Sequence, residues 1–148
     1  MAGYSDVKST FISDTVAADP NGYSTSAAVG DGAALTIGGA LASGGSVTNS
    51  SGRLTVIVSA GDDSGISFTV VGTDVTGAAM TETITGADTD TATGSKYFKT
   101  ITSITAVGDP AGNVEAGHSA DAADVVFAGP TRLKGANMVN DAAAGTVE

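Results

Sequence analysis

Apolar and polar residues alternate through the middle of the chain, from Arg53 to Gly117. Four short runs rich in Val, Ile, Thr and Phe are separated there by turns of Gly, Asp, Ser and Thr. A period of two places successive side chains on opposite faces of a strand, and regularly spaced strands are typical of antiparallel sandwiches and barrels. The pattern therefore predicts an all-β fold, an antiparallel β-sandwich or barrel, with a jelly roll among the topologies left open.

The alternation also sets the expected strands and their inward faces. The strands are expected at Arg53–Ser59, Ile66–Val70, Met80–Thr85, Tyr97–Val107 and Val114–His118. In the first strand, Leu54, Val56 and Val58 share a parity and are expected to face the core. In the fourth strand the parity changes between Ile101 and Ile104, which predicts a β-bulge near Thr102-Ser103.

Gly- and Asp-rich segments predict the connections. Gly61–Gly65 has the length of a hairpin turn between the first two strands, and Thr76-Gly77 is expected to turn a second hairpin. Ala87–Ser95 reads as a polar loop, and Ser43–Ser46 as a flexible connection.

Three segments are expected from this organisation. Residues 1–30 form an N-terminal arm with a turn at Asp19–Gly22, residues 31–140 form the β-domain, and residues 141–148 form a loose C-terminal tail. Within the domain, a first strand is expected at Ala33–Ile37 and one helical turn at Ser119–Asp124. Two further strands are expected at Val125–Phe127 and Arg132–Val139.

One strand carries a carboxylate on its apolar face, because Met80, Glu82 and Ile84 share a parity. An unpaired buried charge is costly, so either that face is only partly buried or the carboxylate has a partner. We expect a structural ion pair between Glu82 and a base such as Arg53 or Lys99.

The charge balance argues against nucleic-acid binding. The chain holds 6 Lys and Arg against 16 Asp and Glu, a net charge of −10, and its basic residues are scattered. Binding to a phosphate backbone needs clustered Lys and Arg. The acidity is expected to serve solubility, and the thin core implied by 21 Gly and 5% aromatics hints at burial against neighbouring subunits.

Cysteine usage and hydropathy limit the chemistry and the location. The absence of Cys excludes disulfides, thiolate metal sites and a Cys nucleophile. The first residues lack the basic and apolar regions of a signal peptide, and no window approaches the ~20 apolar residues of a membrane span. We expect a cytosol-like compartment and no membrane partner.

The candidate catalytic and metal-binding residues are few. His118, the only histidine, has Glu115, Asp121 and Asp124 near it in sequence, and an isolated His at a strand end is expected to be a surface or capping residue. No G-x-S-x-G nucleophile elbow is present, and no glycine run has the order of a phosphate-binding loop. We therefore expect no catalytic residues, no cofactor and no enzyme.

Two acidic segments invite a calcium interpretation, because hard cations take clustered carboxylates. Asp62-Asp63 and Asp88-Thr89-Asp90 do not match the twelve-residue calcium loop, and Asp is also a common turn residue. No metal site is expected, and a calcium-stabilised β module remains an alternative.

A series of motifs resembles a pattern recurrent in tailed-bacteriophage virion proteins. The series comprises Arg53–Val56, Ile66–Asp74 with Gly77, Met80–Ile84, Lys96–Ile104, and Gly112-Asn113-Val114 with Gly117. It covers residues 53–117, less than half of the chain, and it consists of strand and turn patterns. The ordered series is more specific than any one of its members.

The resemblance implies a non-enzymatic capsid decoration (cement) protein. Such proteins bind the major capsid protein on the outer surface of the shell as trimers or other small oligomers, so a homo-oligomer, with a trimer favoured, is expected. The location implied is the virion, with the host cytoplasm during assembly. The alternative is a phage tail, fibre or host-receptor-binding structural module. A host- or glycan-binding domain would need a groove of exposed aromatics from Tyr4, Tyr23 or Tyr97.

Overall fold

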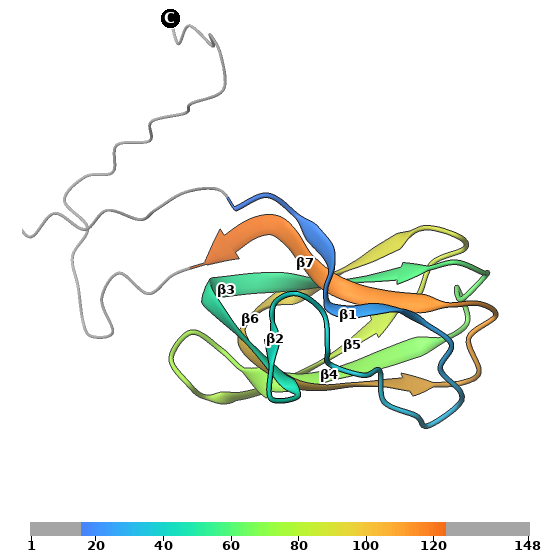
Figure 1. Ribbon diagram of the computed structural model, residues 1–148, viewed down its shortest axis with the longest axis horizontal. Coiled ribbons are helices and arrows are strands. Elements are labelled where there is room, and N and C mark those ends of the chain that lie inside the picture. The colour runs from blue at the N-terminus through green and yellow to red at the C-terminus, as the bar shows by residue number, and fades with distance from the viewer. Residues whose placement is uncertain (1–15, 124–148) are drawn as a thin grey trace, which may run out of the picture.

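The computed structural model describes residues 16–123, and these form one antiparallel sheet of seven strands. The order is β1-β7-β3-β6-β4-β5, with β2 paired to β3 (Figure 1). The sheet is not closed into a barrel, so the fold is all-β and sandwich-like, as predicted. The strands are β1 Asp19–Ala27, β2 Ala42–Ser43, β3 Ser46–Ser59, β4 Ser67–Thr73, β5 Ala79–Thr85, β6 Thr91–Val107 and β7 Val114–Ala123.

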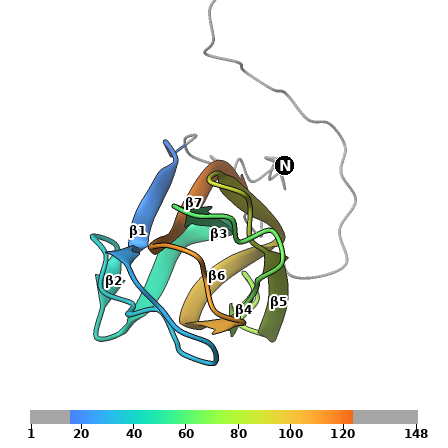
Figure 2. The ribbon, with the colours of Figure 1, turned by 90° about the vertical axis from the view of Figure 1, so that its right-hand side faces the viewer.

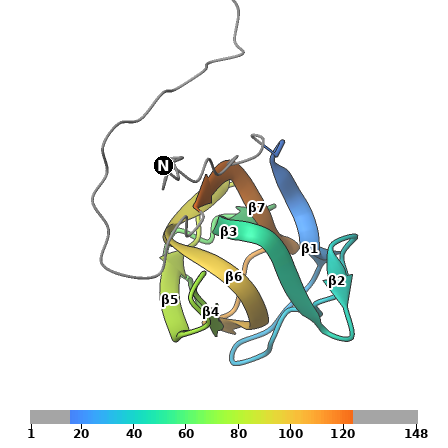
Figure 3. The same cartoon turned by 90° about the vertical axis from the view of Figure 1, so that its left-hand side faces the viewer.

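The sheet wraps around a single core because β6 belongs to both of its halves. Residues 91–101 of β6 pair with β3, and residues 100–107 pair with β4. Seen end on, β1 and β5 lie on opposite sides of the curled sheet (Figures 2 and 3). The core between the halves includes the fully buried rings of Tyr23, Phe68 and Phe98. Aromatic side chains of this size supply a large share of the apolar burial.

The predicted bulge in the long strand is confirmed. Val71 pairs with Ser103 while the next residue, Gly72, pairs with Ile101, so Thr102 is the extra residue on β6. Ile101 and Ile104 are therefore both fully buried, and Thr102 faces outward. An extra residue bends a strand, which helps β6 turn from one half of the sheet to the other.

The predicted inward face of β3 is wrong. Ile57, on the opposite parity, joins the core cluster, whereas Leu54 and Val58 are only half-buried. Val56 is 4% exposed although it lies outside that cluster, so both faces are covered near the middle of this strand. Apolar character therefore does not distinguish the two faces of a strand that lies between β6 and β7.

The segment expected as an arm contributes a strand to the sheet. Residues 19–27 form β1, which pairs with β7, so the predicted turn at Asp19–Gly22 is wrong. Tyr23 anchors β1 in the core, and its carbonyl accepts hydrogen bonds from the N–H groups of Gly38 and Gly39. The Leu41 N–H donates to the Gly22 carbonyl, so the segment 38–41 covers the outer edge of β1.

Three predicted connections also differ from the structure. The first predicted hairpin is wrong, because β3 and β4 are not neighbours in the sheet. Ser43–Ser46 is a tight β2–β3 turn rather than a flexible link, with φ of 60° at Gly44 and 77° at Gly45, which suit a two-glycine hairpin. The predicted loop 87–95 ends early, because β6 begins at Thr91.

The other predicted strands, turns and helical segments compare with the structure as follows. Ala33–Ile37 makes a single bridge, between Ala34 and Thr105, rather than a strand. Residues 119–123 continue β7 instead of forming a helical turn. The second hairpin, β4–β5 around Thr76-Gly77, is confirmed. The strands expected at 125–127 and 132–139 and the tail at 141–148 lie outside the described residues.

Gly72 should be essential to the bend, and Gly72→Ala should lower the free energy of unfolding by about 3 kcal/mol. A Cβ at this position would lie 1.9 Å from the Thr100 carbonyl oxygen, so the backbone must shift. Gly65→Ala is the matched control, because nothing lies within 4 Å of its Cβ. That change should be neutral or slightly stabilising. Urea unfolding measures both, and equal stability of the two variants would contradict the close packing at Gly72.

Candidate functional site

Four buried polar side chains lie in or contact segments where the ladder of backbone hydrogen bonds is interrupted. Asn49, Arg53, Glu82 and His118 are each 8% exposed or less. Register shifts occur in the β3–β6 and β3–β7 pairings next to these residues. Because buried backbone groups need partners, each interruption must be satisfied by something other than the ladder.

At the first interruption, in β6, Glu82 of β5 accepts hydrogen bonds from the backbone N–H groups that the β3–β6 ladder leaves free. Leu54 pairs with Tyr97 and Val56 with Thr93, so a single β3 residue, Thr55, faces the segment 94–96 of β6. The Glu82 carboxylate accepts hydrogen bonds from the Ser95 N–H at 2.6 Å and Ser95 Oγ–H at 2.9 Å. It also accepts the Lys96 N–H at 3.2 Å. Charge-assisted bonds of this kind are stronger than neutral ones.

The prediction that Glu82 forms an ion pair with Arg53 or Lys99 is therefore wrong. Backbone N–H groups of β6 meet the carboxylate, and the Lys96 ammonium instead donates to the Thr81 carbonyl at 2.7 Å. Gly94 leaves the necessary space, since a Cβ there would lie 2.6 Å from the carboxylate. Sequence parity placed the carboxylate on the inward face correctly, but it does not show which strand lies opposite.

A second interruption lies where residues 49–52 of β3 face only Lys99 of β6. The side chains of Asn49 and Lys99 bond to backbone groups there. The Asn49 side-chain amide donates to the Phe98 carbonyl at 3.2 Å and to the Tyr23 hydroxyl at 2.9 Å. The Lys99 ammonium donates to the Ser50 carbonyl. Side chains thus replace the missing backbone contacts.

Arg53 and His118 lie at the third interruption, between β3 and β7. Arg53 pairs with Ala122 and Thr55 with His118, so Leu54 faces residues 119–121. The Arg53 guanidinium donates to the Ala120 carbonyl at 3.4 Å, and His118 Nδ1 lies 2.7 Å from the Ser119 carbonyl oxygen. His118 is 3% exposed, so its expected place as a surface or capping residue is wrong.

Tyr23 joins this region to the core. Its ring lies 5.9 Å from the ring of His118, centroid to centroid, and the hydroxyl accepts from Asn49. Burial raises the pKa of the Tyr23 hydroxyl to about 12, against a smaller lowering by the hydrogen bond from Asn49. A tyrosine held neutral in this way acts as a hydrogen-bonding core residue.

These side chains lack the arrangement that nucleophilic catalysis requires. Thr55 pairs directly with His118 across the strands, yet the buried Thr55 hydroxyl has no hydrogen-bond partner in the described structure. A nucleophile must be within hydrogen-bond reach of its base and open to substrate. Thr55 and His118 therefore do not form a nucleophile–base pair in this structure.

The acidic loops gather at one end of the sandwich, without forming a metal site. Asp62 and Asp88 make an isolated bridge, and Asp62 Oδ1 accepts the N–H and hydroxyl of Ser64. The Ser64 hydroxyl and N–H lower the pKa of the Asp62 carboxyl. Among residues 16–123, no group of three or more His, Asp or Glu side chains is placed to hold a metal ion.

Asp63 is a structural member of the same loops. It is fully buried, and its Oδ1 accepts the Ala111 N–H at 2.8 Å, which ties the 60–66 connection to the turn before β7. Its other carboxylate oxygen has no hydrogen-bond partner in the part of the chain described.

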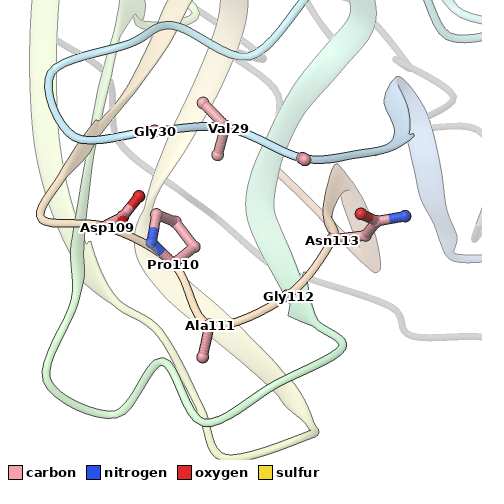
Figure 4. A pocket seen from close by; sticks show the side chains of 8 residues that line it. Val29, Gly30, Asp109, Pro110, Ala111, Gly112 and Asn113 are labelled. Atoms are coloured by element: carbon pink, nitrogen blue, oxygen red, sulfur yellow. The ribbon is translucent and has the colours of Figure 1, made fainter.

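A shallow depression lies beside these loops (Figure 4). It has a volume of about 460 Å³, is open to solvent, and is lined by residues 28–30 and 109–113. Asp109 and Asn113 supply its only polar side chains, and the rest of the lining is small or apolar. Ligand pockets usually enclose their ligand with several convergent polar groups, so this depression is poorly suited to a small molecule.

Comparison with protein-family models, curated proteins and solved structures gave no match. Within residues 16–123, no helix is long and apolar enough to cross a membrane.

Glu82→Ala should lower the free energy of unfolding by about 2–3 kcal/mol, because it leaves N–H groups of Ser95 and Lys96 without acceptors. Glu82→Gln retains one acceptor oxygen and should cost about 1 kcal/mol. The exposed neighbour Thr83 provides the control, since Thr83→Ala should change stability by less than about 0.5 kcal/mol. Urea unfolding and amide exchange at Ser95 and Lys96 measure the effect. Unchanged exchange in Glu82→Ala would disprove the role assigned to the carboxylate.

Ionisation of Tyr23 should weaken the fold between pH 10 and pH 12. The unfolded tyrosine loses its proton near pH 10.0, whereas the folded one holds it to about 12. Its contribution is therefore fully present below pH 10 and is lost as pH rises through 12, a fall of about 2–3 kcal/mol. Denaturant unfolding across this range measures the fall. Tyr23→Phe should lack it, and an equal alkaline loss in that variant would assign the effect to other groups.

Proposed function

We propose that this chain is a capsid decoration protein of a tailed bacteriophage, which binds the major capsid protein and stabilises the shell. In this proposal it is a non-enzymatic structural subunit on the outer surface of the particle. It acts as a small homo-oligomer and reaches the capsid in the host cytoplasm during assembly.

The observation that carries the proposal is where the resembling motifs lie in the fold. Arg53–Val56 lies in β3, Ile66–Asp74 covers β4 and its flanks, Met80–Ile84 lies in β5, and Lys96–Ile104 lies in β6. These segments supply the buried rings of Phe68 and Phe98 and the tight β4–β5 hairpin. The resemblance to virion proteins therefore concerns strands and turns of the scaffold, in β3, β4, β5 and β6, which favours a related binding module over shared chemistry.

The use made of the polar side chains supports a non-enzymatic role. In residues 16–123, the buried Glu82, Asn49 and Arg53 bond to backbone groups or to Tyr23, and none of them lines the open depression. Polar side chains used in this way hold a scaffold together, as a binding protein requires.

The alternative of a receptor-binding module draws less support. It requires a groove of exposed aromatic side chains, and Tyr23, one of the three tyrosines proposed for it, is fully buried. Tyr97 is half-buried in β6, and Tyr4 lies outside the described residues.

Co-sedimentation with capsids tests the proposal directly. The full chain should pellet saturably, and at a fixed ratio, with shells assembled from the major capsid protein encoded in the same genome. Bound shells should also resist heating better than bare shells, because a ligand that binds only the native state stabilises it. Shells of an unrelated phage serve as the control. Failure to pellet would reject decoration, and selective binding to tail tubes or fibres would establish the alternative.

A further inference from the structure

Among the described residues, the outer face of the β5-β4-β6 half of the sheet carries no charged side chain at its paired positions. It comprises the outward residues of β5 and β4, together with the β6 residues that pair with those of β4, in cross-strand rows such as Thr83–Thr69–Thr105. Its twelve positions hold seven Thr, two Ser, two Val and one Ala. They are the odd-numbered residues of 67–73 and of 79–85, together with Thr100, Ser103, Thr105 and Val107.

The absence of charge on this face contrasts with the rest of the molecule. The chain has a net charge of −10, and exposed carboxylates such as Asp62, Asp88 and Asp109 lie in loops at one end of the sandwich. Two copies that meet through that end bring like charges together, which is unfavourable. The uncharged face avoids that cost.

The chemistry of the face is self-complementary. A threonine hydroxyl both donates and accepts, so a hydroxyl surface can satisfy an identical surface. The Thr73 and Thr100 hydroxyls already bond to each other at 2.7 Å within one copy. Val71 and Val107, which are 37% and 55% exposed, add apolar contact area.

The sheet edges are less available than this face. The segment 38–41 covers β1, and at β5 the Lys96 ammonium occupies the Thr81 carbonyl while Glu82 points inward. Inward charges and lysines on an edge are devices that hinder strand addition. Association through the face is therefore favoured over pairing of edges.

We propose that a second copy of this chain packs against the uncharged face, sheet to sheet, across a two-fold axis. A self-complementary patch generates a closed two-fold dimer. Three strands over a length of about seven residues span roughly 14 Å by 24 Å, which is small for a stable interface, so we expect a weak dimer that forms only at high protein concentration. The inference is independent of the proposed function, since it concerns the isolated protein.

Sedimentation equilibrium of the full chain over a wide concentration range tests the dimer. Wild type should change from monomer to dimer, and Thr83→Glu should weaken association at least tenfold, because it places two like charges in the contact. Thr93→Glu makes the same change at an exposed threonine of β6 outside the face, and it should dimerise like wild type. Thermal melting of each variant checks that the fold is retained.

Measuring association at high salt shows whether Thr83→Glu weakens the dimer by charge repulsion or by damaging the fold. High salt should restore part of the association of Thr83→Glu, because screening weakens repulsion between like charges. A monomer at all concentrations, a trimer, or equal association of the two Glu variants would overturn the proposal. Capsid binding lost in Thr83→Glu, with wild type monomeric, would assign the face to the capsid protein instead of a second copy.

Discussion

The fold depends on the supply of hydrogen-bond partners where its strands bend. β6 can serve both halves of the sheet only because it is bulged at two places, and every bulge removes backbone groups from the ladder. Polar side chains restore the lost bonds: Glu82 at residues 95–96, Asn49 at Phe98, and Arg53 at Ala120. Leaving such groups unsatisfied costs more than the bonds themselves contribute, so the curvature of the sheet and its buried polar residues are inseparable.

The local patterns predicted the parts of the fold that depend on local chemistry. Alternation located β5 to within one residue and β4 to within three, and the change of parity after Ile101 located the bulge at Thr102. Long-range pairing is not written in such patterns. For that reason the β3–β4 hairpin was wrong, and the membership of residues 19–27 in the sheet was missed.

The candidate site shows the same division. Parity identified Glu82 as an inward carboxylate, yet its partners come from a strand whose position depends on the whole topology. His118 gave no sequence signal of burial, because a lone histidine at a predicted strand end also suits a surface position. In this protein, a polar residue on an inward face marks a bulge whose free backbone groups it binds. A glycine elsewhere in the chain, Gly94, leaves room for that side chain.

The pairing of β1 with β7 has a consequence for synthesis of the protein. Asp19 lies opposite His118, so the first described strand meets its partner only after nearly the whole described chain has been made. Tyr23 must therefore remain unburied while the later strands emerge from the ribosome. Sheets dominated by contacts distant in sequence fold slowly, over milliseconds to seconds, and expose apolar surface meanwhile. The scarcity of large apolar side chains in residues 24–46 limits what the waiting segment can aggregate with.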